Sequence, residues 1–353
     1  MLMKRAVILV IVSATVLVSC KSRIDYKSGE PEEMLVLSSN MRTDDTTHLA
    51  FLGISKLRES YVITPNEGTI DCYVNGKYVS TAEHIYVNNE EYMVHQESGK
   101  DVSGWYFDAV LHEGDEVRLE ATCGDLHASA TVMVPTTAGL SLIDTMTVSG
   151  SPYDETVKAF KCTVLLKDRP GEESRFRLQT MDSYDITRGD KLLRASSHQT
   201  TFRFDDDVVL RGDFHSSREL AAVKETDINI PLVTNKYCIF TDRDFRDSEH
   251  MADLYFGWGP VLSSRRLPDE HTISNSKTIK LLTLSEDEYD YLLAYTNAEA
   301  NHLMSNNSST QIFFEPVIFP CNVEGGLGLV TVSAVASVRI DFPEIQFDAV
   351  PEY

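Results

Sequence analysis

The stretch Thr69-Ile70-Asp71-Cys72-Tyr73-Val74-Asn75-Gly76-Lys77-Tyr78-Val79 decides the fold class of this chain. Two strand-like runs flank Asn75-Gly76, and an Asn-Gly pair supplies the two positive φ angles that a type I′ turn needs. The sequence therefore predicts a β-hairpin here. A second hairpin is predicted for residues 116–134, where polar and apolar residues alternate on both sides of Gly124-Asp125.

Short strands with frequent turn residues continue on both sides of these hairpins. Residues 34–136 hold about 100 residues of this pattern around the aromatic run 105–107, which favours an immunoglobulin-like β-sandwich. Residues 135–156 are rich in Pro, Gly, Ser and Thr, and we interpret them as the crossover to a second domain. The prediction is an all-β, mainly antiparallel protein with two domains.

The second domain, residues 137–345, is predicted to be larger and also mainly β. A long hairpin is expected from residues 158–166 and 175–181, and a tail from residues 346–353. Further strands are expected at 201–204, 208–210, 235–240, 252–256, 278–284 and 327–340.

One α-helix is predicted, over residues 285–303. Ser285 can cap its first turn, and Glu288 three residues later completes a capping box. Glu286 and Asp287 place negative charge at the positive end of the helix dipole. Tyr291, Leu292 and Tyr295 form an apolar side, so the helix should lie against the second sheet.

The N-terminus has the layout of an export signal. Basic Lys4 and Arg5 precede an apolar run of 13 residues, 6–18, and the run ends in Leu17-Val18-Ser19-Cys20. A membrane-spanning helix needs about 20 apolar residues, so this run is too short. We predict that residues 1–19 are a lipoprotein signal peptide, that acylated Cys20 anchors the chain to the lipid bilayer, and that residues 20–33 are a flexible tether. An ordinary cleaved signal is the alternative.

Charge narrows the range of partners. The chain has 54 acidic and 32 basic residues and a formal net charge of −22, and loss of residues 1–19 would remove only Lys4 and Arg5. A surface this negative repels phosphate backbones, so nucleic-acid binding is excluded. Two interpretations stay open: the charge keeps a tethered domain soluble, or it forms an acidic groove for cationic ligands.

The five cysteines after Cys20 are isolated in the sequence. Without a paired Cys or Cys/His spacing they predict neither a structural metal site nor a cofactor. Export permits disulfides, and Cys72 with Cys123 is the candidate pair because both fall in strand-like runs. The alternative is that all five are small buried apolar residues.

Several short motifs in the sequence indicate loops and candidate modification sites rather than catalytic or metal sites. The acidic runs 205–207 and 242–247 lack the glycine and final glutamate of an EF-hand, so they are interpreted as solvated loops rather than calcium sites. The tripeptide 211–213 (RGD) indicates only a loop. Thr46 and Thr145 lie in Asp-Thr sequences that resemble O-glycosylation acceptors of exported Bacteroidota proteins. The sequence contains no metalloprotease, nucleophile-elbow or phosphate-loop motif, so no catalytic residue is assigned.

The C-terminal third carries a family resemblance. The predicted helix, then Phe314-Glu315-Pro316, then 322–329 (NVEGGLGL) resemble the closing segment of the domain-of-unknown-function 4249 family, which are lipoproteins of Bacteroidota. The run Phe240-Thr241-Asp242 with Phe245 resembles the family's Phe-Ser-Asp-x-x-Phe-x-Gly, except that Asp247 stands where the family has glycine. The glycines at 325, 326 and 328 are interpreted as a turn or bulge before the last strand.

The resemblance implies an outer-membrane lipoprotein that accompanies a TonB-dependent transporter, with no established catalytic residues. We therefore expect a non-catalytic binding or accessory module, lipid-anchored in the outer membrane and facing either the periplasm or the cell surface. Two other classes stay open: a fimbrillin-like structural subunit and a cell-envelope hydrolase whose site is assembled from scattered residues.

Overall fold

A computed structural model describes most of the chain after the predicted tether. The described residues are 33–55, 62–63, 65, 67–86, 102–151, 154–171, 173–204, 207–215, 234–257, 271–307 and 317–347. The predicted signal peptide, Cys20 and the tether to residue 32 lie outside them, as does the 314–316 part of the family resemblance.

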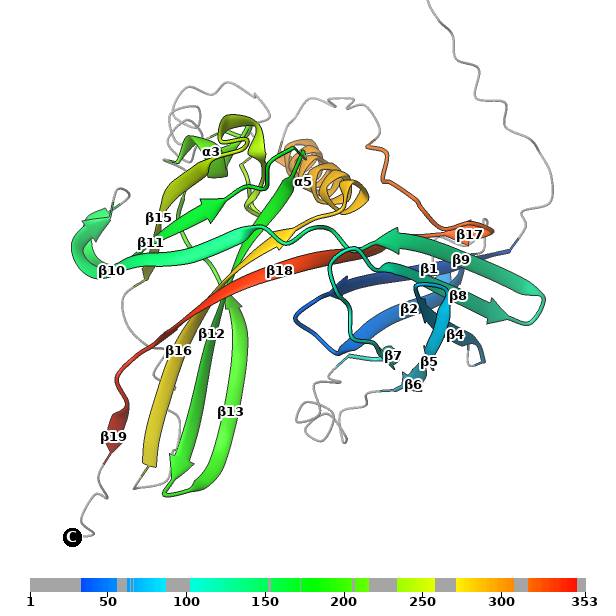
Figure 1. The fold of residues 1–353 in the computed structure, drawn as a ribbon, viewed down its shortest axis with the longest axis horizontal. Helices are drawn as coiled ribbons and strands as arrows, with labels where there is room; N and C mark the ends of the chain where they lie inside the picture. Colours follow the sequence, from blue (N-terminus) through cyan, green and yellow to red (C-terminus); the bar gives the residue numbers. More distant parts are fainter. Residues whose placement is uncertain are drawn as a thin grey trace, which may run out of the picture.

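Three β-sheets form the described part of the molecule, with α5 (Glu286–Asn307) on top (Figure 1). The largest has 12 strands. Its main path is β13 (Lys191–Thr200), β12 (Arg175–Arg188), β16 (His271–Thr283), β18 (Val330–Asp341), β1 (Met34–Arg42), β2 (Thr47–Ser55), β7 (Gly104–Asp108) and β6 (Glu83–Ile85). Four short strands pair beside this path: β3 (Val62–Ile63), β14 (Ile239–Thr241), β17 (Gly326–Leu327) and β19 (Ile345–Phe347). The all-β class is confirmed.

The first lobe is a sandwich in which β1, β2, β7 and β6 face a four-stranded sheet. That sheet runs β5 (Lys77–Thr81), β4 (Thr69–Val74), β8 (Glu116–Cys123) and β9 (Leu126–Met133). Both predicted hairpins are present, and Asn75 (φ 53°) and Gly76 (φ 72°) take the positive angles of the first turn. Trp105 and Phe107 are buried in the core between the two sheets, as the aromatic run predicted.

The second lobe has three layers. A sheet of β10 (Gly139–Ser151), β11 (Asp154–Lys167) and β15 (Glu249–Gly257) packs against one face of β12 and β16 through an apolar core that contains Leu166, Phe176 and Leu281. The opposite face carries α5, whose Leu292 packs with Ile239, Leu282 and Leu284. The helix therefore lies against the sheet, as expected.

Strand β18 belongs to both lobes. Its first residues, Val330 to Ser333, pair in parallel with β1, and its residues Ala334 to Asp341 pair antiparallel with β16. Figure 1 shows β18 as one long strand that crosses from the first lobe to the second. The two predicted domains are therefore joined through a continuous sheet as well as through the chain near residue 136.

Several local predictions were wrong. The proposed crossover contains strand β10, because residues 140–148 (LSLIDTMTV) are rich in β-branched and apolar residues that favour a strand. Residues 208–210 form the short helix α3 (Val208–Arg211), because Asp207 caps it by accepting a hydrogen bond from the Leu210 amide at 3.0 Å. Strands β11 and β12 lie in different sheets and do not form a hairpin. The predicted tail begins with β19.

The glycine run near the C-terminus is a turn, as predicted, and it also allows close packing. Gly325 (φ 72°) and Gly328 (φ 118°) take angles that other residues rarely adopt. A β-carbon on Gly326 would lie 2.6 Å from the Leu35 carbonyl oxygen. This run therefore positions β17 and β18 directly against β1.

Asp247, which stands where the family has glycine, takes a positive φ angle that glycine readily adopts. Its φ is 57°, its Oδ1 accepts a hydrogen bond from the Gly171 amide at 2.8 Å, and its own amide donates to Asp168 Oδ2 at 3.0 Å. Aspartate is one of the few residues that tolerate this region. This turn is therefore compatible with either aspartate or glycine at position 247.

Glu288 attaches helix α5 to the seam between the lobes, that is, to the paired strands β1 and β18. Ser285 caps the helix, accepting a hydrogen bond from the Glu288 amide at 3.3 Å. The Glu288 carboxylate does not complete the predicted capping box. It is buried and accepts hydrogen bonds from Asn40 on β1 at 2.7 Å and from Ser333 on β18 at 2.6 Å. The helix start is thus fixed to both strands that join the lobes.

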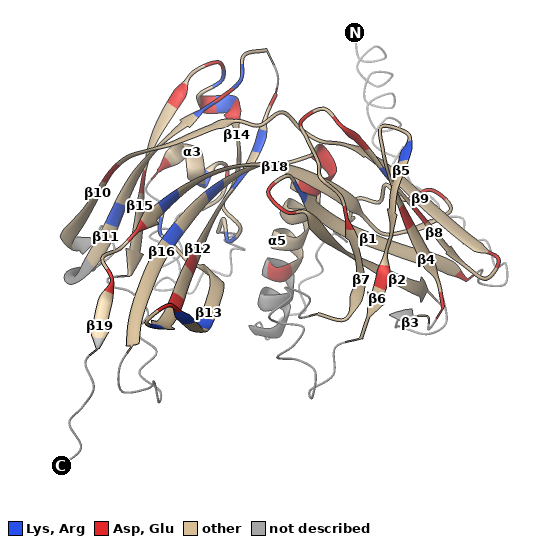
Figure 2. Cartoon of the chain, turned by 60° about the horizontal axis from the view of Figure 1, so that its bottom comes forward, with Lys and Arg blue, Asp and Glu red and all other residues tan. Residues whose placement is uncertain are grey.

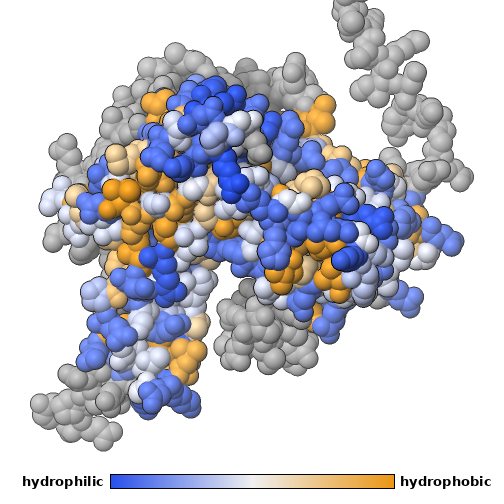
Figure 3. Space-filling view, viewed as in Figure 1, coloured by the Kyte–Doolittle hydropathy of each residue, from blue (hydrophilic) through white to orange (hydrophobic). Residues whose placement is uncertain are grey.

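Charge and apolar surface are distributed unevenly. Acidic segments outnumber basic ones on the first lobe, whereas β11 and β12 carry residues of both signs and β16 carries the basic Lys277 and Lys280 (Figure 2). Some of these basic residues pair with an acid on a neighbouring strand, as Lys161 does with Asp253 on β15 at 2.7 Å. The outer face of the three-stranded sheet exposes Ile143, Met146 and Met251, and Figure 3 shows apolar surface over this region.

Removing the Glu288 carboxylate should destabilise the protein strongly. Glu288→Ala leaves the Asn40 and Ser333 donors without their acceptor, so we expect a loss of about 3 kcal/mol in the free energy of unfolding. Glu286→Ala is the control on the same turn, because that side chain is mostly exposed and forms one surface ion pair with Arg175; its loss should stay below about 1 kcal/mol. Equal losses in urea denaturation would contradict the role assigned to Glu288.

The Asp247 turn gives a second test. Asp247→Gly and Asp247→Ala both remove the acceptor of the Gly171 amide, but only alanine is strained at φ 57°. We expect the alanine variant to be less stable than the glycine variant by about 1 kcal/mol, measured by denaturant titration. An alanine variant as stable as the glycine variant would show that the turn changes its conformation.

Candidate functional site

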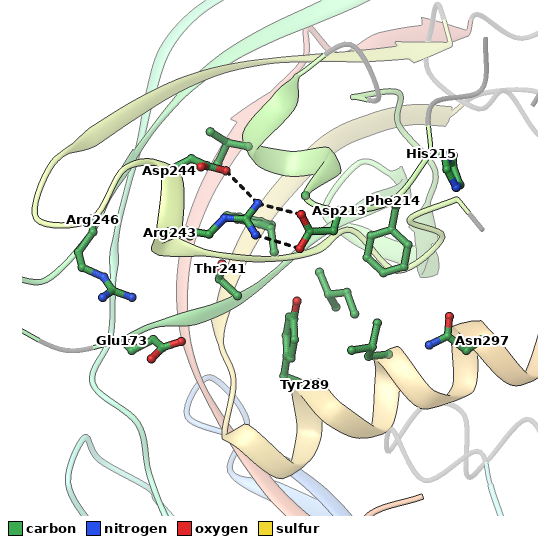
Figure 4. Close-up of a pocket in the computed structure, with 15 residues that line it drawn as sticks. Glu173, Asp213, Phe214, His215, Thr241, Arg243, Asp244, Arg246, Tyr289 and Asn297 are labelled. Carbon is green, nitrogen blue, oxygen red and sulfur yellow. Dashed lines mark hydrogen bonds and ion pairs between the residues drawn. The ribbon is translucent and has the colours of Figure 1, made fainter. Parts of the chain in front are cut away.

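The candidate site is a pocket of about 510 Å³ in the second lobe, between α5 and the segments around α3 and β14 (Figure 4). This volume falls within the roughly 300–1,000 Å³ of pockets that bind small molecules. Val209, Ile239 and Leu293 provide apolar lining. The polar lining comes from Glu173, Asp213, His215, Thr241, Arg243, Asp244, Arg246, Tyr289 and Asn297.

The α3 side of the pocket is held by local backbone chemistry. Asp207 caps the start of α3, and Gly212 ends it with a φ of 60°, so the chain turns and Asp213 and Phe214 reach the pocket. The buried Asn235 side chain donates to the carbonyls of Leu210 at 2.8 Å and Ile239 at 2.7 Å. It thereby ties α3 to β14, and both segments lie on the side of the pocket that faces α5.

The basic groups of the pocket are already paired with acids of the same chain. Arg243 makes two hydrogen bonds of 2.9 Å to the two oxygens of Asp213, and its Nη2 lies 3.5 Å from Asp244 Oδ2. These hydrogen bonds raise the pKa of Arg243 and lower the pKa of Asp213. Both groups therefore stay charged at neutral pH.

Arg246 is paired in a similar way behind the rim. It donates to the fully buried Asp242 at 3.1 and 3.2 Å, and these bonds raise the pKa of Arg246. Asp242, Asp244 and Asp247 thus bind separate partners and do not form a common cation site. Asp242 is buried, so the prediction that the whole run 242–247 is a solvated loop is wrong for this residue. No cluster of three or more potential metal ligands occurs among the described residues.

Tyr289 supplies the aromatic wall on α5. Its ring stands up from the helix and its hydroxyl points toward the pair of Arg243 and Asp213 (Figure 4). Burial raises the pKa of Tyr289, and the negative charge of Asp213 raises it further, so the hydroxyl stays protonated. Phe214 faces the pocket from the other side, and Asn297 lies one helical turn past Leu293. Together these groups offer aromatic surface, hydrogen-bond donors and acceptors in fixed positions.

The sequence singles out two of these segments, but not as parts of a pocket. The tripeptide 211–213 indicates only a loop, and Phe240 to Phe245 is part of the family resemblance. The fold brings them together, because Asp213 pairs with Arg243 thirty positions later. Tyr289 was missed: it lies two positions before Tyr291, on a helix described only by its capping and its apolar side.

The predicted modification sites lie elsewhere. Thr46 is exposed between β1 and β2, and Thr145 is half-buried on β10 opposite Cys162. Glycosylation of either residue stays a prediction, as does acylation of Cys20 in the segment Leu17 to Cys20, which lies outside the described residues.

The predicted disulfide between Cys72 and Cys123 is not formed. Cys72 pairs with Leu119 across the sheet, four residues before Cys123 on β8, which is about 13 Å along a strand. Cysteines with Cα atoms more than about 7 Å apart do not bridge. Cys72, Cys162 and Cys238 are buried free thiols, whereas Cys321 is exposed and Cys123 is partly exposed. The alternative interpretation as buried apolar residues thus holds for three of the five.

A second pocket, of about 470 Å³, lies in the first lobe. Its lining is largely apolar and includes Phe51, Trp105 and Tyr86, with the His84 ring 4.2 Å from that of Trp105. The α5 pocket is the stronger candidate because polar groups of several kinds converge on it.

Comparison with known proteins gives one result. A family model described as a domain of unknown function, DUF4249, matches residues 21–339, which is nearly the whole described chain. No curated protein matches the sequence. Among the described residues, no helix is both long and apolar enough to cross a membrane.

Thiol reactivity tests the cysteine environments. Burial raises the pKa of Cys72 to about 11 and of Cys162 to about 12, so both stay almost fully protonated at pH 8 and react slowly. We expect iodoacetamide to label exposed Cys321 first in the native protein and to label Cys72 and Cys162 only after denaturation, as read by peptide mass spectrometry. A peptide linking Cys72 to Cys123 in a non-reduced digest would contradict the structure.

Proposed function

The chain belongs to the domain-of-unknown-function 4249 family, and from this premise we propose that it is a membrane-tethered, non-catalytic binding module. In this proposal it captures a small ligand in the α5 pocket and acts beside a transporter of the outer membrane. The observation that carries the proposal is the pocket itself, whose aromatic and polar groups are held in place before any ligand arrives.

Preformation favours binding, because little ordering is left for the ligand to cause. Asp213 holds the forked guanidinium group of Arg243 (the Arg243 fork), Asn235 holds α3, and Glu288 holds α5 against the sheet. The paired state of the charged groups also supports binding over catalysis. Arginine and aspartate that neutralise one another lack the shifted proton affinity of a general acid or base near neutral pH.

The sequence supports a tether on the same molecule. The signal ending in Cys20 predicts a lipid anchor, and residues 20–33 lead directly into β1, which pairs with β18 at the seam of the large sheet. Fourteen extended residues span at most about 50 Å. A tether of that length would hold the pocket near the membrane, where a transporter could receive the ligand.

Co-purification tests this function. With an affinity tag after Tyr353, membranes of the native host are solubilised in mild detergent and the proteins that accompany the full chain are identified. We expect a TonB-dependent barrel in equal amount. The control is Cys20→Ala, which removes the acylation site and should release the chain from the membrane fraction together with the loss of the barrel.

Two outcomes would contradict the proposal. A ladder of self-polymers would favour the fimbrillin-like subunit, because such subunits assemble by donating strands to one another. A lipidated chain that purifies without any membrane partner would remove the accessory role and return the hydrolase to consideration.

A further inference from the structure

We infer that the α5 pocket is built for a neutral, polyhydroxylated ligand, that is, an oligosaccharide without acidic groups. This inference rests on the proposed function, since it names the chemical class that the binding module would take. It follows from which groups of the pocket are already occupied and which stay open.

The positive charges of the pocket are occupied. Both hydrogen bonds of the Arg243 fork go to the two oxygens of Asp213, and Arg246 is paired with the buried Asp242. A ligand carboxylate or phosphate would have to displace a carboxylate that is held within the same chain and therefore at high effective concentration. The pocket is thus poorly suited to anions, even though two arginines line it.

The open groups suit hydroxyls. The Tyr289 hydroxyl, the Asn297 amide and the Thr241 hydroxyl each donate and accept hydrogen bonds, and Thr241 makes no side-chain capping bond to η1 (Asp242–Asp244). Sugar hydroxyls have the same double capacity. The Asp213 and Asp244 carboxylates keep further lone pairs that accept hydroxyl hydrogen bonds while they stay paired with Arg243.

The aromatic groups suit the other side of a sugar ring. Tyr289 and Phe214 flank the pocket (Figure 4), and Ile239 and Leu293 add apolar lining. A pyranose has a face of C–H groups that packs on such surface while its equatorial hydroxyls reach the polar rim. A cationic amine would also find carboxylates here, so it serves as the competing outcome in the test.

The test uses the full lipidated chain in a detergent without a sugar headgroup. The protein is applied to an array that holds neutral oligosaccharides and their uronic-acid counterparts, and spermidine is titrated separately as the cationic probe. We expect the tightest binding to neutral oligosaccharides and weaker binding both to the matched uronates and to spermidine. Binding only to uronates or spermidine, or no binding to any neutral oligosaccharide at millimolar concentration, would overturn the inference.

Variants connect the binding to this pocket. Asn297→Leu keeps the size of the side chain but removes its hydrogen bonds, and should weaken the best neutral oligosaccharide about tenfold. Asp290→Leu is the matched control on the exposed side of the same helix and should leave affinity unchanged. Equal affinity in Asn297→Leu and the control would place the saccharide elsewhere and overturn the assignment.

Asp213→Asn gives the sharpest readout. Asp213 is mostly exposed, so its replacement should not unfold the chain, but it removes the charge that occupies the Arg243 fork. We expect the preference to shift at least about tenfold toward the uronate of each matched pair. An unchanged preference would show that Arg243 does not govern ligand charge. If no saccharide binds but the barrel still co-purifies, this inference fails and the proposed function stands. If a saccharide binds but no barrel co-purifies, this inference stands and the proposed partnership with a transporter fails.

Discussion

The pairing of β18 with two different strands is the constraint on which the rest of the molecule depends. Four residues of β18 continue the first lobe through β1 and eight continue the second lobe through β16. Backbone hydrogen bonds across both pairings keep the large sheet continuous, so the lobes cannot rotate freely about a linker. The glycines before β18 serve this arrangement, because a β-carbon on Gly326 would collide with the Leu35 carbonyl of β1.

The same seam between β1 and β18 also holds α5, which forms one wall of the pocket. Glu288 attaches the start of α5 to β1 and β18, and Asn322 adds a second tie by donating to Asp287 on α5 at 3.1 Å and to the Val330 carbonyl at 2.7 Å. Asn322 is the asparagine of the family-like Asn-x-x-Gly run. That run therefore has a structural role: it links the helix, the closing strand and the first lobe at one place.

Local signals were predictable from sequence, and long-range pairing was not. Asn75-Gly76 needs only its own backbone preference to specify a hairpin, and Ser285 needs only the next turn to cap a helix. The sequence pattern of β11 and β12 predicts a hairpin. The two strands belong to different sheets, however, because β12 pairs with β16, which lies about a hundred residues later in the chain. The pocket depends on such distant contacts, since Asp213, Arg243 and Tyr289 carry no shared pattern. Glu288 shows the limit most clearly, because a capping glutamate and a buried cross-lobe acceptor look the same in the sequence.

The net charge of the whole chain does not determine which charged groups of the pocket are available to a ligand. A chain with 54 acidic and 32 basic residues has more acids than basic groups, so an arginine at the surface is readily neutralised by its own chain. Arg243 and Arg246 are both neutralised in this way, the second by an aspartate that is fully buried. The excess of acid elsewhere on the chain therefore does not by itself indicate the charge of the ligand. Ligand preference is instead set by the few groups left unpaired, and at the α5 pocket these include a tyrosine, an asparagine and a threonine, which have no net charge.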